Sequence, residues 1–398
     1  MRIAEDSTKK PDVAVVGAGP IGLAAARIAA ESGARTLVVE KKSKPSPSCC
    51  TGLVSPQTLS TLEVSNQCVL QKIYAVCVQL PSGRQINLQS DDLKAVTIDR
   101  GVLERELLDK ARSAGAIIQF NTEAVGASNG VLQVNADRIS AQLHPEVIMG
   151  ADGPRSRIAS WFSIEQPAEF AIGAQVEVEG VSFSNHRVKV FFGSTIAPGF
   201  FGWSVPAQDG VLRIGLGVLP PHNPNGFLDR LLAKHYPTAR IRSRATGYIP
   251  LARVANPTAP GLLLVGDAAG QLKPLSGGGL YTGGLCARLA GTAAARIAKH
   301  ESGSEDRAVV RDDYQRQCLE AIGKEQAFGH SMRTHLSHLS DTDIEAMAEA
   351  LDDPQLLQFL ADEANIDCFH KLPDRLACEP RLWSTLLRMV PLLGSLTN

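Results

Sequence analysis

The chain has 398 residues, of which 44% are hydrophobic and 20% charged, and its formal net charge is -1 at pH 7. This length allows two or three packed units, and the balanced, interspersed charge argues against nucleic acid as a partner. The eight cysteines are scattered and include no Cys-x-x-Cys pair, which favours a reducing, cytoplasmic location over a secreted disulfide scaffold. No run reaches the ~18–20 apolar residues of a membrane-spanning helix, although the protein could still lie on a membrane surface.

The N-terminal region predicts a β-α-β unit. Residues 13–16 have the apolar character of a strand buried on both faces, and residues 21–32 predict an alanine-rich helix that ends at Gly33. A second buried strand is predicted over residues 36–39 and ends at Glu40. The size of the whole unit is typical of such motifs.

Three glycines, Gly17, Gly19 and Gly22, form a G-x-G-x-x-G pattern between the first strand and the helix. In such a loop the first glycine makes the turn, the second lets the backbone approach a pyrophosphate, and the third lets the helix pack on the strand. The helix N-terminus offers N–H groups to phosphates, and Glu40 can accept hydrogen bonds from a ribose. The combination predicts a dinucleotide-binding domain.

A capped helix is predicted further along the first half. Asp99 is placed as the N-cap of a helix over residues 101–113, with Gly115 just beyond its end. Arg100 lies at the start of this helix, where it could contact a cofactor or form a surface salt bridge.

The pattern changes to alternating β-rich runs over residues 172–218, which predicts an antiparallel sheet inserted between Rossmann-like segments. A buried strand returns at 261–266, and the chain is mostly helical from Gly283 onward. We therefore predict an α/β fold: a Rossmann-type dinucleotide-binding domain, identified as an FAD-binding domain by the motifs described next, an inserted antiparallel β-sheet substrate domain and a helical C-terminal region. The predicted bounds are 1–60, 96–158 and 258–300 for the FAD-binding domain, 61–95 and 159–257 for the substrate domain, and 301–398 for the helical domain.

The choice of FAD over NAD depends on a second glycine-rich segment. Gly266 and Asp267 follow a buried strand, and Gly277–Gly279 open another helix after Pro274. The aspartate can hold the ribityl hydroxyls of a flavin. The glycine-rich helix start can place backbone N–H groups at the flavin N1–C2=O edge. A third motif, Gly150–Arg157, lies between these two glycine-rich segments.

These three motifs in this order resemble the p-hydroxybenzoate-hydroxylase-type FAD superfamily, from residue 12 to about residue 295. The resemblance implies that the first motif binds the ADP half, Asp267 the ribityl chain, and Asp152 supports the flavin site, which in hydroxylases also serves NADPH. Arg100 matches an arginine that contacts FAD in this superfamily. The FAD-binding residues predicted in this way are Gly17, Gly19, Pro20, Ile21, Gly22, Glu40, Lys41, Cys50, Gly52, Arg100, Val125, Asp152, Gly266, Asp267, Pro274, Gly277, Gly278, Gly279 and Leu280.

A further signature separates classes of flavoenzyme. Phe201-x-Trp203-x-Val205-Pro206, followed by Gly215-x-Gly217, resembles the (Tyr/Phe)-x-Trp-x-(Tyr/Phe)-Pro and Gly-x-Gly signature of geranylgeranyl reductases, from which Val205 departs. The segment from Cys50 to Ser55 is similar to the cysteine-glycine loop of that family, and the helical tail is similar too. Members of the family use reduced FAD to saturate isoprenoid double bonds in archaeal lipids, chlorophyll side chains and menaquinone tails. The resemblance implies such a reductase, with an isoprenoid or prenyl lipid as substrate.

The chemistry of this reaction requires a proton donor, because nothing polarises an isolated alkene and the site must add a proton as well as a hydride from flavin N5. Cys50 is our candidate, and Cys49 is the alternative because the register of the loop is uncertain by one residue. Either thiol could instead be an inert buried side chain. Trp203 could line the isoprenoid cavity or simply pack in the sheet, and Tyr281 could steer the substrate.

Two other functions remain as alternatives: a flavin monooxygenase or halogenase acting on a small aromatic substrate, and a catalytically silent FAD-binding lipid carrier. Halogenases carry Trp-x-Trp-x-Ile-Pro with a lysine beside it, whereas here the first position is Phe201 and no lysine lies nearby in the sequence. Aromatic hydroxylases usually carry a histidine after the Gly-Asp-Ala-Ala stretch, where this chain has Gly270 and Gln271. The intact cysteine loop argues against a silent carrier.

The remaining signals concern the electron donor, metals and the tail. Because no second nucleotide loop follows Gly215-x-Gly217, the donor (NADPH, ferredoxin or another reductant) is expected to dock briefly at the flavin. We predict no metal site, since His330, His335 and His338 lack i, i+4 spacing and accompanying ligands. The apolar tail could contact a membrane or pack on the FAD-binding domain. The oligomeric state is not predicted.

Overall fold

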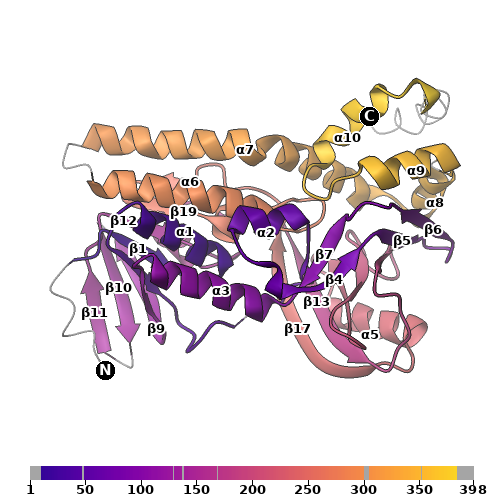
Figure 1. Ribbon diagram of the computed structural model, residues 1–398, viewed down its shortest axis with the longest axis horizontal. Coiled ribbons are helices and arrows are strands. Elements are labelled where there is room, and N and C mark those ends of the chain that lie inside the picture. Colours follow the sequence, from indigo (N-terminus) through magenta and orange to yellow (C-terminus); the bar gives the residue numbers. More distant parts are fainter. Residues whose placement is uncertain are drawn as a thin grey trace.

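The computed structural model describes residues 10–46, 49–128, 130–136, 139–167, 169–299, 304–350 and 352–382. The molecule is elongated, with the Rossmann-type half at one end and a large sheet at the other (Figure 1). Two long helices, α6 (Leu280–Lys299) and α7 (Ser304–His338), run side by side along its length and contact each other. The predicted α/β architecture with an inserted antiparallel sheet and a helical C-terminal region is confirmed.

The Rossmann-type half is built on a six-stranded sheet of order β18-β19-β12-β1-β2-β8. All neighbouring strands are parallel except for the β18–β19 pair. The strands are β1 (Val13–Val16), β2 (Thr36–Val39), β8 (Ile117–Gln119), β12 (Val147–Gly150), β18 (Thr258–Ala259) and β19 (Leu262–Leu264).

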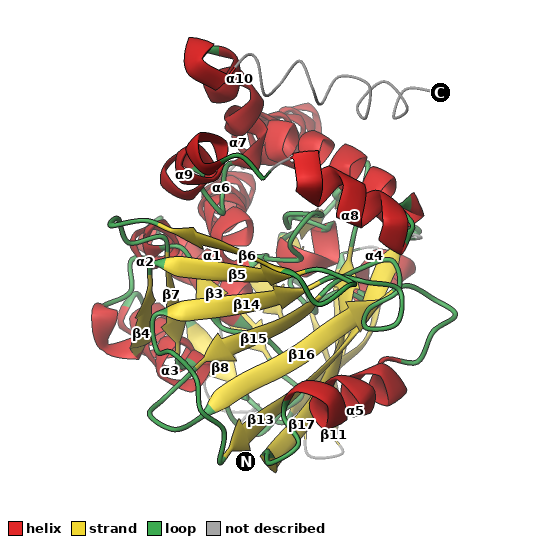
Figure 2. Ribbon diagram, turned by 90° about the vertical axis from the view of Figure 1, so that its right-hand side faces the viewer, coloured by secondary structure: helices red, strands yellow, loops and turns green. Residues whose placement is uncertain are grey.

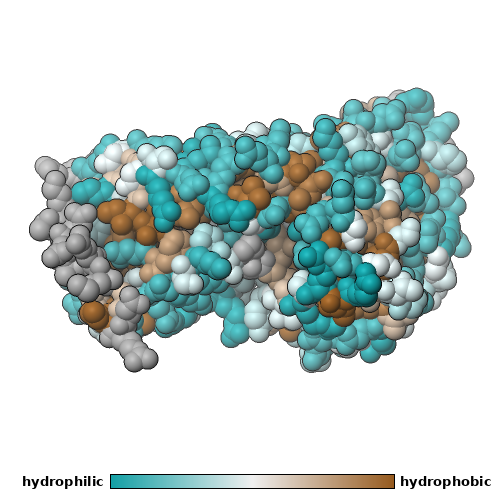
Figure 3. All heavy atoms as spheres, turned by 60° about the horizontal axis from the view of Figure 1, so that its bottom comes forward, coloured by the Kyte–Doolittle hydropathy of each residue, from teal (hydrophilic) through white to brown (hydrophobic). Residues whose placement is uncertain are grey.

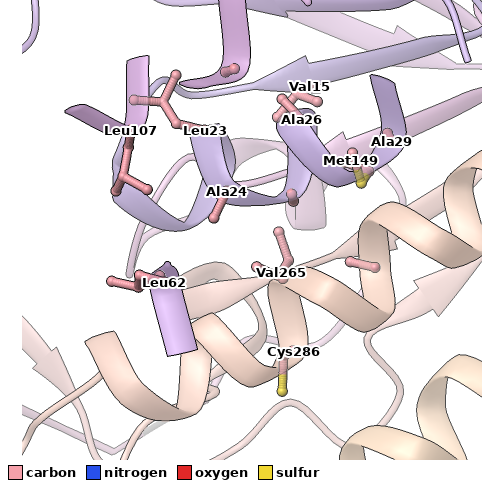
Figure 4. Packing of buried hydrophobic residues seen from close by; sticks show 14 of the residues in the cluster. Val15, Leu23, Ala24, Ala26, Ala29, Leu62, Leu107, Met149, Val265 and Cys286 are labelled. Atoms are coloured by element: carbon pink, nitrogen blue, oxygen red, sulfur yellow. The ribbon is translucent and has the colours of Figure 1, made fainter. Parts of the chain in front are cut away.

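Alternate residues of β1 point into different layers. Val13 and Val15 pack with helices α1 (Pro20–Glu31), α3 (Arg100–Ser113) and α6, as Figure 4 shows for Val15 and the alanines of α1. Ala14 and Val16 pack instead against a three-stranded sheet. This second sheet comprises β9 (Thr122–Ser128), β10 (Val131–Ala136) and β11 (Ile139–Leu143), and the short helix α4 (Arg157–Trp161) packs beside it. Burial on both faces explains why these parallel strands are continuous apolar runs.

The other half is a seven-stranded sheet of order β17-β13-β16-β15-β14-β5-β6. Its pairs are antiparallel except for β14 and β5. Helix α5 (Pro224–His235) packs on one face, over β13 and β16 (Figure 2), and the opposite face is turned toward the Rossmann-type half. The strands are β5 (Ala75–Gln79), β6 (Gln85–Gln89), β13 (Phe170–Glu179), β14 (Arg187–Phe191), β15 (Gly202–Pro206), β16 (Leu212–Val218) and β17 (Arg240–Pro250).

A small sheet of order β3-β7-β4 joins the two halves. Its strands are β3 (Leu53–Val54), β4 (Val69–Ile73) and β7 (Ala95–Ile98), and helix α2 (Pro56–Leu62) and the 3₁₀ turn η1 (Asn66–Cys68) lie between β3 and β4. These strands pair across the predicted domain boundaries at residues 60 and 95. The backbone hydrogen bonding is therefore continuous there, and the division into domains stays a prediction.

The C-terminal region is helical. After α7 come α8 (Asp341–Ala350), α9 (Pro354–Glu363), the 3₁₀ turn η3 (Phe369–Lys371), α10 (Leu372–Ala377) and η4 (Pro380–Leu382). Helix α9 begins at Pro354, and the Asp353 side chain caps it by accepting hydrogen bonds from two N–H groups of its first turn. The apolar tail that could contact a membrane lies, from residue 383 on, outside the described residues.

Within the described part of the chain, no helix is both long and apolar enough to span a bilayer. On the face drawn in Figure 3, apolar side chains form separate patches among hydrophilic ones.

Candidate functional site

The glycine loop after β1 shows why two of its glycines are required. Gly17 has φ +107°, and a Cβ on it would lie 2.4 Å from the carbonyl oxygen of Ala151. A Cβ on Gly22 would lie 2.1 Å from the carbonyl oxygen of Gly17. Nothing lies within 4 Å of a Cβ on Gly19. The turn and the helix packing thus require Gly17 and Gly22, whereas Gly19 leaves open the space in which a pyrophosphate can approach the backbone.

Glu40 braces the same loop from the end of β2. Its Oε2 accepts a hydrogen bond from the Ala18 N–H at 2.8 Å, and its Oε1 accepts one from the Lys42 N–H at 2.9 Å. Each carboxylate oxygen has a second lone pair, so the group can still accept hydrogen bonds from a ribose.

Asp152 is used mainly inside its own motif. Its Oδ1 accepts a hydrogen bond from Ser156 Oγ at 2.6 Å, and its Oδ2 accepts one from the Arg157 N–H at 2.8 Å and one from the Ile158 N–H at 3.2 Å. The carboxylate therefore holds the start of α4 in place beside the glycine loop.

Asp267 is the carboxylate that faces the cavity without a partner. The residue lies in the 3₁₀ turn η2 (Gly266–Ala269), after β19, where its carbonyl accepts from the Gly270 N–H at 3.0 Å, but its carboxylate makes no hydrogen bond or ion pair with the described residues. Burial raises the pKa of this carboxyl, while the Arg100 guanidinium acts in the opposite direction. A half-buried acceptor that lines a cavity and has no donor fits a ligand that brings hydroxyl groups, as the ribityl chain of a flavin does.

The turn Gly277–Gly279 lies next to Asp267 and opens α6. Gly277 has φ +73°, and a Cβ on it would lie 2.7 Å from a side-chain carbon of Ile249. A Cβ on Gly279 would lie 2.9 Å from Asp267 Oδ1. Side chains are thereby kept out of this turn, so that its backbone N–H groups are accessible to a flat ligand.

Arg100 is buried rather than part of a surface salt bridge. Its Nη2 donates to Glu104 Oε1 at 2.7 Å, and the side chains of the two residues are 9% and 3% exposed. Burial by itself would lower the pKa of the guanidinium, but Cys50 and Glu104 together hold it above its usual value.

The cysteine loop (residues 49–52) is fixed to the seven-stranded sheet by two side chains. Gln175 Nε2 donates to the Cys50 carbonyl at 3.1 Å, and Gln175 Oε1 accepts from Trp203 Nε1 at 3.0 Å. Arg213 Nη1 donates to the carbonyl oxygen of Thr51 at 3.0 Å. Neither Gln175 nor Arg213 was predicted as a site residue, although a polar side chain inside an otherwise apolar strand is the signal that could have identified both.

The two cysteines of the loop differ in their surroundings. Burial, together with the neighbouring Cys50, raises the pKa of the Cys49 thiol to about 11. Cys50 Sγ accepts a hydrogen bond from the Gly52 N–H at 3.4 Å. Both cysteines line the main cavity and also a second cavity of about 370 Å³ that includes Arg213 and Arg242. The cysteine loop therefore lies between the two cavities.

The main cavity, of about 700 Å³, runs from the glycine loop to the seven-stranded sheet. Its far end is lined by apolar side chains from separate parts of the chain: Val188, Val190, Phe201, Trp203, Val205, Ile249, Ile366 and Phe369. The Gly215-x-Gly217 pattern makes this wall possible, because a Cβ on Gly215 would lie 2.7 Å from the Trp203 ring and a Cβ on Gly217 2.6 Å from the Phe200 ring.

Most of the predicted site residues line this one cavity. They are Gly17, Gly19, Pro20, Ile21, Gly22, Glu40, Lys41, Cys49, Cys50, Gly52, Arg100, Asp152, Trp203, Gly266, Asp267, Gly277, Gly278, Gly279 and Leu280. Val125, Pro274 and Tyr281 are not among the lining residues.

Lys273 lines the cavity although it is far from Trp203 in the sequence, whereas the Lys189 side chain lies over the Phe191 ring, on the α5 face of the sheet. Lys273 Nζ is held by Asp367 Oδ1 at 2.7 Å and by the Ile366 carbonyl at 2.6 Å. Among the residues placed by the structure, no group of three His, Cys, Asp or Glu side chains could hold a metal ion.

The comparisons with known proteins agree with this site. A family model described as an FAD binding domain matches residues 10–211. Digeranylgeranylglycerophospholipid reductase 1 of Methanothermobacter thermautotrophicus is 32% identical over 370 residues, which cover 86% of this chain and 90% of that protein. Digeranylgeranylglycerophospholipid reductase 2 of Methanopyrus kandleri is 29% identical over 387 residues, which cover 92% of this chain and 96% of that protein.

Solved structures share the fold. A geranylgeranyl bacteriochlorophyll reductase-like protein from Thermoplasma acidophilum superposes with a TM-score of 0.80 at 23% identity, covering 91% of this chain and 98% of that chain. A flavin-dependent brominase variant superposes with a TM-score of 0.67 at 14% identity, covering 92% and 98%. The glycine cradle, the unpartnered Asp267 and the family match together fit FAD as the cofactor. The chain belongs to the geranylgeranyl reductase family of FAD-dependent oxidoreductases.

Proposed function

We propose that this enzyme saturates carbon–carbon double bonds in the isoprenoid chain of a prenyl lipid. The observation that carries the proposal is the continuity of the main cavity, in which the glycine cradle and the apolar wall around Trp203 enclose one space. A cofactor in the cradle and an apolar chain against the wall would then be in contact. The names of the archaeal relatives support a prenyl lipid as the substrate class.

The reaction adds two hydrogens across the double bond. When bound, FAD in its reduced form supplies the hydride. We propose that the Cys50 thiol supplies the proton to the other alkene carbon, and that solvent returns a proton to the sulfur afterwards. The thiolate left in between would lie beside the Arg100 guanidinium, whose pKa Cys50 helps to raise. Arg100 would thus stabilise the donor after it has lost its proton.

Cys49 is the less suitable donor of the two. Because its pKa is raised to about 11, the Cys49 thiol holds its proton more tightly than an ordinary cysteine. Gln175 has a positioning role in the proposal, since one side chain fixes both the Cys50 carbonyl and the Trp203 ring. The face of that ring would favour developing positive charge on the alkene by ~0.5–2 kcal/mol.

The electron donor is proposed to be external and to dock at the flavin, and a peripheral membrane contact would give access to a lipid. Tyr281, which lies outside the lining of the cavity, is proposed to act only through its neighbours. We also propose that the division into an FAD-binding, a substrate and a helical domain follows the bounds given above.

The test is anaerobic. The enzyme is reduced with dithionite, a geranylgeranyl lipid is added, and flavin reoxidation is followed together with the mass of the lipid. We expect reoxidation and a gain of two hydrogens for each bond reduced. No reoxidation without oxygen, combined with NADPH-driven hydroxylation or halogenation of an aromatic substrate in its presence, would overturn the proposal.

The matched pair Cys50→Ala and Cys49→Ala tests the proton donor. We expect Cys50→Ala to slow saturation by about 10²-fold or more with FAD still bound, as is typical of the loss of an acid catalyst. Cys49→Ala should retain most of the activity. Equal rates for the two variants would show that Cys50 has no special role.

A further inference from the structure

Among the residues that the structure describes, four cationic side chains are buried, and they differ in their partners. Arg27 pairs with Glu63 at 2.8 Å, Arg100 with Glu104 at 2.7 Å, and Lys273 with Asp367 at 2.7 Å. The fourth, Arg333, is only 3% exposed and pairs with no carboxylate of the described residues. A buried charge without a counter-ion is costly, so its position needs a reason.

The guanidinium of Arg333 is held by backbone and aromatic groups instead. Its Nη1 donates to the Gly199 carbonyl at 3.1 Å and its Nη2 to the Leu275 carbonyl at 2.6 Å, while its Nε has no partner. Burial lowers the pKa of this side chain to about 10. The group therefore still carries its positive charge at pH 7.

Its location is next to the turn that opens α6. The guanidinium carbon lies 4.2 Å from the centre of the Phe200 ring, and that ring stacks on Phe201 at 4.5 Å and 14°. The far edge of Phe200 is 3.8 Å from the place where a Cβ on Gly277 would lie. The Phe200 ring thus touches both the charge and the glycine turn, and Phe201, whose ring centre lies 5.7 Å from the same guanidinium carbon, lines the main cavity.

Helix α7 carries Arg333 to this position through close packing. One turn earlier on the helix, a Cβ on Gly329 would lie 3.1 Å from Pro274 and 3.2 Å from the Leu275 nitrogen. The other ionisable group on this turn, His330, lies 3.8 Å from Glu169, and both side chains are about half exposed at 45% and 58%. Of the two ionisable side chains on this turn of α7, Arg333 is therefore the one without a carboxylate partner among the described residues.

A cofactor that gains negative charge would supply the missing counter-ion. Two-electron reduction of FAD with uptake of one proton (FAD + 2e⁻ + H⁺ → FADH⁻) adds one negative charge to the flavin. In a protein interior such a charge interacts with a nearby cation much more strongly than it would in water. The interaction favours the reduced cofactor over the oxidised one, because only the reduced form carries this charge.

We propose that Arg333 is a positioning residue that holds the Leu275–Gly277 turn and places an uncompensated positive charge beside it, so that FAD binds more tightly in its reduced, anionic form. The inference concerns FAD and needs no assumption about the isoprenoid substrate.

The experiment measures the reduction potential of the bound flavin under anaerobic conditions, with dithionite as reductant and reference dyes. Arg333→Met removes the charge, and Arg333→Lys keeps it. We expect Arg333→Met to shift the equilibrium about tenfold toward oxidised flavin, a potential about 30 mV lower. Arg333→Lys should leave the equilibrium within threefold of the wild type. Arg27→Met serves as the control, because it removes a buried cation that has a carboxylate partner and lies outside the site.

A purely structural role predicts a different pattern. In that case Arg333→Met and Arg333→Lys would both lower thermal stability or the affinity for oxidised FAD and leave the potential of the remaining bound flavin unchanged, which overturns the proposal. If Arg333→Met does not retain FAD, Arg333→Gln is measured in its place against the same criterion. A failure of alkene reduction would not affect this result, since the titration contains no lipid.

Discussion

The cofactor cradle and the apolar wall of the main cavity are built in different ways. In the cradle, Gly17, Gly22 and Gly277 exclude side chains, so that the backbone itself forms the binding surface. In the wall, side chains from β14, β15, β17 and the C-terminal region meet, and hydrogen bonds such as that of Gln175 to Cys50 hold distant segments together. Cofactor binding here therefore depends on local backbone geometry, whereas the shape of the substrate space depends on how separate strands and the C-terminal region pack.

The largest effect is expected in the cradle, from Gly22→Ala. Its Cβ would meet a backbone oxygen at 2.1 Å, so the apoprotein should lose about 1–3 kcal/mol of stability and bind FAD poorly. Gly19→Ala, which has open space around it, should leave the melting temperature of the apoprotein unchanged and weaken only FAD binding. Thermal unfolding and FAD titration of both variants test this. Equal destabilisation of the two apoproteins would contradict our account of the loop.

A comparable change in the wall is Gly215→Ala, whose Cβ would lie 2.7 Å from both the Ala174 carbonyl oxygen and the Trp203 ring. We expect a loss of about 1–3 kcal/mol and slower turnover, with FAD still bound, because both the ring and the neighbouring strand at Ala174 must move away. Gly173→Ala is the matched control in the neighbouring strand, since its nearest neighbour is 3.5 Å away. If both variants unfold at the same denaturant concentration, the close contact of Gly215 with Trp203 is not important.

Asp267→Asn separates stability from binding within the cradle. Because burial raises the pKa of this carboxyl in the folded protein, its ionised form is unfavourable at neutral pH. The apoprotein should therefore be more stable with asparagine at pH 7, and this gain should disappear as the pH falls below the unfolded pKa of about 3.9. FAD affinity should fall by about tenfold or more, since hydrogen bonds to a charged acceptor are lost. Calorimetry of apo and FAD-bound forms distinguishes the two effects, and unchanged FAD affinity would contradict the assigned role.

The smallest effect is expected outside both regions, from Glu63→Gln. The hydrogen bond from Arg27 is the main cause of the lowered pKa of Glu63, so the pair contributes stability above the unfolded pKa of about 4.3 and loses it as the pH falls through the folded pKa. Since Glu63 is 46% exposed, we expect a loss below about 1 kcal/mol at pH 7 and none at low pH. Denaturant titrations at both pH values test this, and FAD affinity should not change.

The geometry of the cradle could be predicted from local sequence patterns. The order of strand, glycine loop, helix and acidic residue predicted the turn at Gly17, and Asp99 caps α3 as expected, with its side chain accepting from the Val102 N–H at 3.0 Å. These features depend on residues a few positions apart, for which the backbone conformation and hydrogen bonding are local. The FAD cofactor and the family followed from motifs of this kind.

The side chains that complete the site are brought together by tertiary packing and could not be predicted from the sequence. Gln175 reaches Cys50 because the register of β13 turns it to the same face of the sheet as Arg213 and Trp203. Arg333 reaches the Leu275–Gly277 turn, and Asp367 reaches Lys273, because the C-terminal region packs there, and no spacing along the chain encodes these contacts. Asp152 fits its motif, yet its oxygens bind the start of α4. Such long-range contacts depend on strand register and on the packing of helices against sheets, which local sequence patterns do not specify.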